Sequence, residues 1–167
     1  MMAELQEAEY KMFDLSGTNV RVKAETVGAA QRLVVEVLGA ASPHYGKSGK
    51  AEFVPALKLL KDRIEQAVAL VSKKATLEQT YGRESEGESY NIIFRVIPPK
   101  GSEQRNPSEL TVISDAINEV LSTVGQEFAA ELGKTRQELA AEEARYQARY
   151  KQRSDQFQRG SSGSAIS

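Results

Sequence analysis

The segment from Ala41 to Ser48 carries the residue types needed to bind phosphate. It reads Ala-Ser-Pro-His-Tyr-Gly-Lys-Ser, the looser form of a phosphate-binding loop, with alanine in place of the first glycine. In that chemistry backbone N–H groups surround the phosphates, Lys47 contacts the outer phosphates and Ser48 binds magnesium. A helix should then begin at Lys47, but Gly49 follows and Pro55 comes soon after. We therefore interpret the segment as a cationic loop, and a nucleotide-binding enzyme with Lys47 and Ser48 at its cofactor is a remote alternative.

Other residues offer little catalytic chemistry. His44 is the sole histidine and the chain has no cysteine, so zinc would need carboxylates for its remaining ligands. Glu84, Glu86 and Glu88 alternate, but they lack the aspartate-rich spacing and fixed glycine of a calcium loop. The chain has no Gly-x-Ser-x-Gly element, and no serine can be placed in a histidine–carboxylate relay. We expect no metal, no cofactor and no enzymatic activity.

The last third of the chain has the most informative pattern. From Ser108 to Arg159 it contains no proline and is patterned as one helix. At about 1.5 Å per residue such a helix would reach roughly 75 Å, against about 30 Å for a compact domain of the remaining size. A helix longer than its own domain packs on another molecule or stands in water. The pattern therefore predicts a function in assembly.

The apolar residues of this helix fall into a dense half and a sparse half. The dense half steps by three and four residues and is expected to pack on the chain's own sheet; its members are Leu110, Ile113, Ile117, Val120, Leu121, Val124, Phe128 and Leu132. The sparse half holds only Leu139, Tyr146, Tyr150 and Phe157 among polar residues, and we predict that these four anchor a partner. Gly125 and Gly133 are weak points for the helix, and Gly133 is the predicted site of a bend.

Charge is segregated along the same helix. Residues 108–143 hold eight acids and two bases, whereas residues 144–159 hold five bases and one acid. The simplest reason is that acids early and bases late complement the helix dipole. A second reason is self-association, because an antiparallel pair of such helices would match the two blocks whereas a parallel pair would oppose like charges. In that arrangement Arg145, Arg149 and Arg153 would set the orientation of the partner.

Nucleic acid is the alternative partner for this helix. Its basic residues interleave with Tyr146 and Tyr150 at helical spacing, which offers both phosphate contacts and stacking platforms. The segment is short, however, and residues 138–143 beside it are acidic. The formal net charge of −1 also argues against nucleic-acid binding by bulk charge. We therefore place this function second to protein binding.

The first half of the chain must supply the compact domain. Strands are expected over Tyr10–Leu15 and over residues 19–24, joined as a hairpin by a turn that contains Gly17. Thr26 is then expected to begin a helix that reaches Ala41, because apolar residues recur at three- and four-residue steps. The rival interpretation is a buried strand over residues 33–38, where three valines favour extended structure.

After a loop over residues 39–49, a second helix is expected with Pro55 in its first turn. It is expected to fade only near Tyr81, and its buried stripe is Leu57, Leu60, Ile64, Val68 and Val71. Residues 83–89 are polar and are expected to be mobile. Tyr90–Ile97 is the clearest strand, and isoleucine on both faces predicts a central position in the sheet. Residues 100–107 form a loop, after which Ser108 caps the long helix.

The element order β-β-α-α-β-α predicts an α+β fold. We expect a small, mainly antiparallel sheet covered by helices on one side, with a long protruding C-terminal helix. The expected divisions are a compact domain over residues 1–132, an extended interaction helix over residues 133–159, and a flexible Gly/Ser tail over residues 160–167.

Composition narrows the function classes further. No apolar run reaches the 18 or so residues of a membrane span, and the start has neither the basic nor the apolar region of a signal peptide. With no cysteine, the chain fits a cytoplasmic or virion-associated protein. We predict a non-enzymatic structural or assembly protein that binds a protein partner or self-associates as a coiled coil. A component of a phage or another multi-subunit particle fits this design by analogy.

Overall fold

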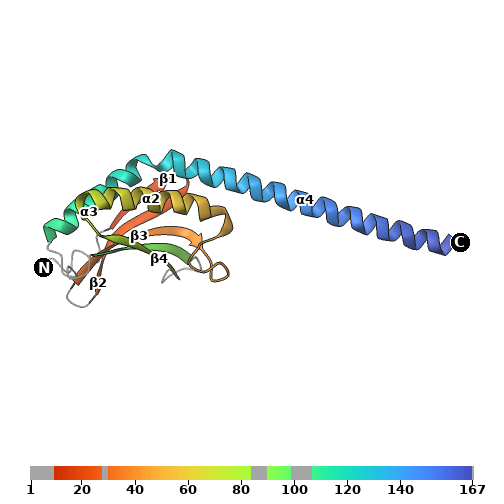
Figure 1. Cartoon of the computed structure of the whole chain (residues 1–167), viewed down its shortest axis with the longest axis horizontal. Helices are drawn as coiled ribbons and strands as arrows, with labels where there is room; N and C mark the ends of the chain where they lie inside the picture. Colours follow the sequence, from red (N-terminus) through yellow and green to blue (C-terminus); the bar gives the residue numbers. More distant parts are fainter. Residues whose placement is uncertain (1–9, 28–29, 84–89, 99–106, 167) are drawn as a thin grey trace. The chain divides into compact units, whose positions relative to one another are not determined.

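The computed structural model describes residues 10–27, 30–83, 90–98 and 107–166, and within them the fold is α+β, as predicted (Figure 1). The elements in chain order are β1 (Tyr10–Leu15), β2 (Thr18–Val27), β3 (Ala30–Ala41), the 3-10 helix η1 (Ala51–Phe53), α2 (Val54–Val71), β4 (Thr76–Arg83), β5 (Tyr90–Ile97), α3 (Pro107–Thr123) and α4 (Gly125–Ile166). Contacts between residues divide the chain into two units, Met1–Leu132 and Gly133–Ser167. Each unit is described by itself.

The sheet has five strands in the order β1-β2-β3-β5-β4, and every neighbouring pair is antiparallel. The predicted hairpin is confirmed. Its turn places Ser16 at φ 53° and Gly17 at φ 112°, and the Gly17 N–H donates to Oδ1 of Asp14 at 2.7 Å. Strand β5 lies between β3 and β4, so the predicted central position of Tyr90–Ile97 is also confirmed.

The prediction of a helix from Thr26 to Ala41 is wrong, because residues 26–27 end β2 and Ala30–Ala41 forms the whole of β3. The rival strand interpretation of residues 33–38 is the correct one. Strand β3 pairs with β2 on one side and with β5 on the other. Val35 and Val37 face the helices, while Val34 is buried on the opposite face. A strand buried on both faces has no clean alternation, so its apolar residues matched helical steps by coincidence.

The second helix begins as predicted, with Pro55 in the first turn of α2, but it ends at Val71 rather than near Tyr81. Lys74 takes a positive φ of 67° in the turn that follows. Residues 76–83 then form β4, an edge strand in which only Leu77 is buried. An edge strand with one buried side chain gives too short a pattern to separate it from the end of a helix. The observed order is therefore β-β-β-α-β-β-α-α.

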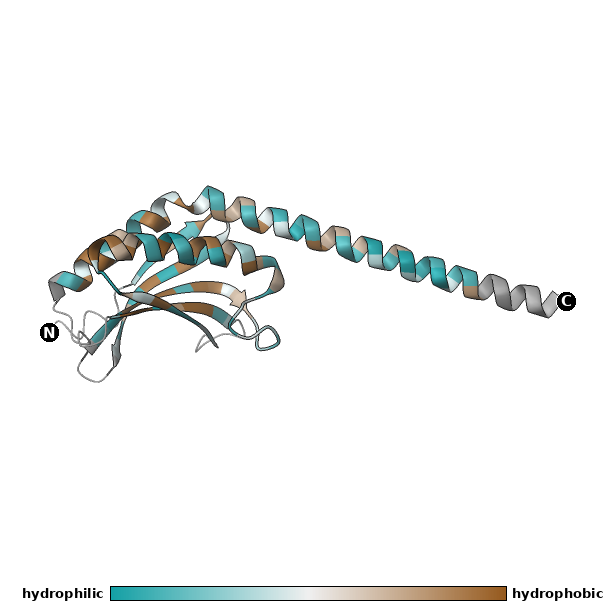
Figure 2. Ribbon diagram, viewed as in Figure 1, coloured by the Kyte–Doolittle hydropathy of each residue, from teal (hydrophilic) through white to brown (hydrophobic). Residues whose placement is uncertain are grey.

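Helices α2 and α3 lie on the same face of the sheet (Figure 1). Their apolar residues and those of the sheet form one core, and Figure 2 shows the hydrophobic bands in α2, α3 and the strands. The stripe predicted for α2 is buried except for Val71, which is 44% exposed. The stripe predicted for the long helix is buried at Ile113, Ile117, Leu121, Val124, Phe128 and Leu132. Leu110 and Val120 are half-buried against the same core.

The predicted single long helix is interrupted at Val124, where α3 ends and α4 begins. The hydroxyl of Ser122 donates to the carbonyl of Asn118 at 2.7 Å, and that of Thr123 donates to the carbonyl of Val120 at 3.2 Å. Such bonds to the preceding turn loosen and bend helices. The assigned helix is not interrupted at Gly133, the predicted bend.

Helix α4 extends to Ile166, and it therefore includes most of the Gly/Ser-rich segment that was expected to form a separate tail. Adding a residue to an existing helix is far less costly than starting one, so weak helix formers can follow a long helical segment. Two predictions lie outside the described residues: the acidic alternation at Glu84–Glu88 and the loop before α3. The cap predicted at Ser108 is wrong, because α3 begins at Pro107 and Ser108 lies within its first turn.

Candidate functional site on the C-terminal helix

The C-terminal part of α4 exposes all its described side chains. From Arg136 to Phe157 every residue is exposed, and the ribbon there is mainly hydrophilic with isolated hydrophobic bands (Figure 2). The four predicted anchors are among the exposed residues: Leu139 at 36%, Tyr146 at 57%, Tyr150 at 65% and Phe157 at 79%. A large apolar group left in water on an otherwise polar helix is the feature expected of an interface before its partner binds.

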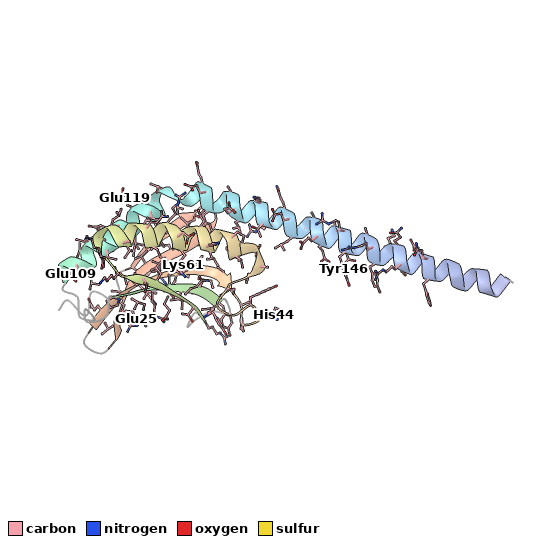
Figure 3. The ribbon with its side chains drawn as sticks, in the orientation of Figure 1. Glu25, His44, Lys61, Glu109, Glu119 and Tyr146 are labelled. Atoms are coloured by element: carbon pink, nitrogen blue, oxygen red, sulfur yellow. The ribbon has the colours of Figure 1, made fainter. Side chains whose placement is uncertain are left out.

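Two of these anchors lie beside two of the predicted arginines. Tyr146 and Tyr150 are four residues apart, as are Arg149 and Arg153, and each tyrosine lies three residues before an arginine, so the four share one face of the helix. Their side chains line a common shallow hollow on the helix surface. Figure 3 shows the Tyr146 side chain extending away from the helix. This face combines aromatic rings with positive charge. Arg145 is exposed as well, but it is not among the residues that line the hollow.

The charged residues of this helix keep much of their bonding capacity. Oε1 of Glu143 accepts one hydrogen bond, from Nε2 of Gln147 at 2.8 Å. Among the residues that the structure describes, neither Arg149 nor Arg153 forms an ion pair. A carboxylate accepts several hydrogen bonds and a guanidinium donates five. These groups are therefore able to bind charges of opposite sign on another molecule.

The loop from Ala41 to Ser48 has a different structure from a phosphate cradle. Two of its backbone N–H groups already have acceptors in the protein: those of Tyr45 and Gly46 donate to the carbonyl of Ser42 at 3.0 and 3.1 Å. The N–H of Lys50 donates to the carbonyl of Ala40 at 2.8 Å. A phosphate site needs several such N–H groups pointing at the ligand, next to the start of a helix.

The chain after this loop also differs from a phosphate site, because α2 begins at Val54, well beyond Lys47 and Ser48. The carbonyl of Lys47 accepts a hydrogen bond from Nε2 of Gln79 at 2.7 Å, which fixes the loop against β4. His44 is exposed and contacts Tyr45 edge to face, with ring centroids 5.0 Å apart. Figure 3 labels His44 in this loop after β3. The geometry favours the cationic-loop interpretation.

The sheet face opposite the helices carries an ion-pair network that the sequence reading missed. Glu36 of β3 is only 6% exposed, and its Oε1 lies 3.0 Å from both Nε of Arg21 and Nζ of Lys23 on β2. On the other side of β3, Arg95 of β5 pairs with Glu25 at 3.0 Å. The residues at this face are Lys23, Glu25, Val34, Glu36, Ile93 and Arg95, which line a shallow hollow.

This network is internally satisfied. Each acid of the hollow already has a basic partner, so the face has little unbalanced charge to attract a ligand. The alternation of Arg21 and Lys23 with valines marked the polar face of β2 in the sequence. Their partner Glu36 was missed because β3 was expected to be a helix, which would place it on a different surface.

The described residues lack two features that would point to other functions. Nowhere in that part of the chain do three His, Cys, Asp or Glu side chains gather closely enough to hold a metal ion. None of the helices there has both the length and the apolar character needed to cross a membrane.

Comparison with protein-family models, with curated proteins and with solved structures finds no match to this chain. Function therefore has to be argued from the geometry of the molecule itself.

Proposed function

We propose that this chain is an assembly protein whose C-terminal helix binds another protein chain. The observation that carries the proposal is the exposure of Leu139, Tyr146, Tyr150 and Phe157 on one helix. Fully burying one such side chain contributes about 1.5–3 kcal/mol. Four of them on each of two chains would offset the cost of association, which is about 4–15 kcal/mol.

The composition of the helix supports the same proposal. Between Leu132 and Phe157 the chain is rich in Gln, Glu, Ala and Arg, which favour helix but leave few groups to pack. Most helical stability in proteins comes from packing of an apolar face, and residues 136–157 are exposed along their whole length. A partner chain would supply that packing. A cytoplasmic or virion-associated particle built from several subunits is a setting that fits a non-enzymatic protein of this design.

Native mass tests the proposal. The full chain and a chain that ends at Leu132 are compared by sedimentation velocity over a wide range of protein concentrations. We expect the full chain to associate as the concentration rises and the shortened chain to remain a folded monomer. A full-length variant with alanine at Leu139, Tyr146, Tyr150 and Phe157 should behave like the shortened chain. The same monomeric mass for all three proteins would contradict the proposal.

Nucleic-acid binding is the second candidate function, and the hollow shared by Tyr146, Arg149, Tyr150 and Arg153 is the observation that favours it. Aromatic rings beside guanidinium groups can stack bases and contact phosphates. The test is retention of single-stranded DNA at rising salt by the full chain and by a variant with glutamine at Arg145, Arg149 and Arg153. Retention that weakens with salt and disappears in the variant would support this function. Equal, negligible retention by both proteins would exclude it.

A further inference from the structure

The exposed stripe of α4 has a symmetry that identifies its partner. The large apolar and charged residues of the stripe step by four and three residues, as in a coiled coil. They are Leu139, Glu143, Tyr146, Tyr150, Arg153 and Phe157, and all six are exposed. In a two-stranded coiled coil these positions form the layers of the interface, so each residue must find a suitable mate in the facing helix.

The stripe is complementary to itself about Ala148, because positions at equal distances before and after Ala148 carry residues that can pair. The residues nine positions before and after Ala148 are Leu139 and Phe157, both apolar. The residues two positions before and after it are Tyr146 and Tyr150, both aromatic. At five positions on either side lie Glu143 and Arg153, which are opposite in charge.

We propose that two copies of this chain pair through residues 139–157 as an antiparallel coiled coil centred on Ala148. The inference rests on the proposed assembly function and names the partner as a second copy. Each Leu139 would lie opposite Phe157 of the second copy, and each Tyr146 opposite Tyr150. Each Glu143 would lie opposite Arg153, so the polar layers are charge pairs and specify the register.

A parallel arrangement lacks this complementarity. In a parallel, in-register pair each residue meets its own copy, so Glu143 would face Glu143 and Arg153 would face Arg153. Like charges placed against each other in an interface disfavour that partner orientation. The segregation of charge along the helix also favours the antiparallel pair. In that pair the acidic residues 138–143 would lie beside basic residues of the second copy.

The two-fold axis that relates the two helices at Ala148 also produces one unfavourable contact. Arg149 is adjacent to Ala148 and flanks the stripe, so it would lie near Arg149 of the second copy. Gln147, on the other side of the axis, would meet its own copy without a charge conflict. The Arg149 contact gives a directional expectation: Arg149→Gln should tighten the pair.

A charge swap in the full chain tests the register. Glu143→Arg and Arg153→Glu should each raise the dimer Kd about tenfold or more, because each variant places like charges in two layers. The double variant Glu143→Arg/Arg153→Glu should return the Kd to within about threefold of the original chain. Asp155→Arg and Lys151→Glu are the matched controls, since they make the same charge changes away from the stripe. Both controls should leave the Kd unchanged.

The outcomes separate this inference from the proposed function. If the double variant dimerises no better than the single ones, the register is wrong. If all four proteins dimerise equally, the orientation is wrong. In both cases the proposed function stands when alanine at the four apolar positions still abolishes the dimer. A full chain that is monomeric at all concentrations overturns both the inference and the proposed function on which it rests.

Cysteine cross-linking provides a second measurement that does not depend on the charges. The chain has no cysteine of its own, so Leu139→Cys and Phe157→Cys each introduce a single thiol. An antiparallel pair predicts that neither variant cross-links with itself and that a mixture of the two forms a mixed disulfide under mild oxidation. Self-linked dimers of each single variant would indicate parallel helices and overturn the inference.

Discussion

The apolar side chains of α3 and the start of α4 are buried, whereas those farther along α4 are exposed. In α3 and the first turns of α4, Ile113, Ile117 and Phe128 are at most 1% exposed. Farther along α4, Tyr150 and Phe157 are 65% and 79% exposed. Both segments are helical and both carry apolar residues at regular steps. The difference teaches that the density of the apolar stripe, rather than helical periodicity, separates a helix that completes its own core from one whose apolar residues stay exposed.

Alanine substitution at two phenylalanines of α4 tests this contrast most strongly. Phe128→Ala should lower the free energy of unfolding by about 3–5 kcal/mol, because it removes a fully buried ring and leaves a cavity. Phe157→Ala should change it by less than about 0.5 kcal/mol at concentrations where the chain is monomeric. Urea unfolding measures both values. Equal losses would mean that Phe157 belongs to a core.

Substitution of two glycines by alanine extends the comparison to the backbone. Gly49 has φ +85°, and a Cβ there would lie 2.7 Å from Cδ1 of Leu57 and 3.0 Å from the carbonyl oxygen of Ala40. Gly49→Ala should therefore cost about 2–4 kcal/mol of unfolding free energy. Gly133 is helical with no heavy atom within 4 Å of such a Cβ, so Gly133→Ala should stabilise α4 by up to about 1 kcal/mol. Thermal melts followed by circular dichroism report both changes, and a stabilising Gly49→Ala would refute this account of the loop.

Two glutamates extend the comparison to charge. Glu36→Ala leaves Arg21 and Lys23 without their shared partner on the sheet, and the expected loss of unfolding free energy is about 1–2 kcal/mol. Glu143→Ala in the C-terminal helix should cost less than about 0.5 kcal/mol in the monomer. Chemical denaturation at low protein concentration separates the two. A neutral Glu36→Ala would show that the sheet network contributes specificity rather than stability.

The smallest effect on the free energy of unfolding is expected at a solvent-exposed ion pair. Arg63 of α2 forms a two-point ion pair with Glu127 of α4, and both side chains are over two-fifths exposed. Arg63→Ala should therefore cost less than about 1 kcal/mol, and added salt should reduce that difference. Unfolding at low and high ionic strength provides the measurement. A loss that is large and independent of salt would contradict this reading of the pair.

Sequence reasoning predicted the parts of the fold whose signals are local. The hairpin at Gly17, the start of α2 at Pro55 and the strand from Tyr90 to Ile97 each depend on turn or breaker residues beside an apolar pattern, and each is confirmed. Strand β3 was misassigned because its side chains are buried on both faces, which hides the alternation of a strand. That burial depends on the place of β3 between β2 and β5, and this pairing exists only in the folded sheet.

The remaining differences also have physical causes. Strand β4 depends on pairing with β5, since only Leu77 is buried and its own pattern is weak. The interruption at Val124 lies next to Gly125, one of the two glycines predicted to weaken the helix, and beside the hydroxyl bonds of Ser122 and Thr123, which a periodicity argument does not include. For the candidate site, the sequence supplied the anchors and arginines of α4. It missed Glu36, whose place beside Arg21 and Lys23 exists only in the folded sheet.

Amide hydrogen exchange at two protein concentrations tests the central claim most directly. If a second copy covers the C-terminal helix, protection of residues 136–157 should rise with concentration, while protection of β5 stays constant because it belongs to the core. Equal exchange of residues 136–157 at both concentrations, when these lie far apart, would contradict the claim that this helix is covered by another copy of the chain.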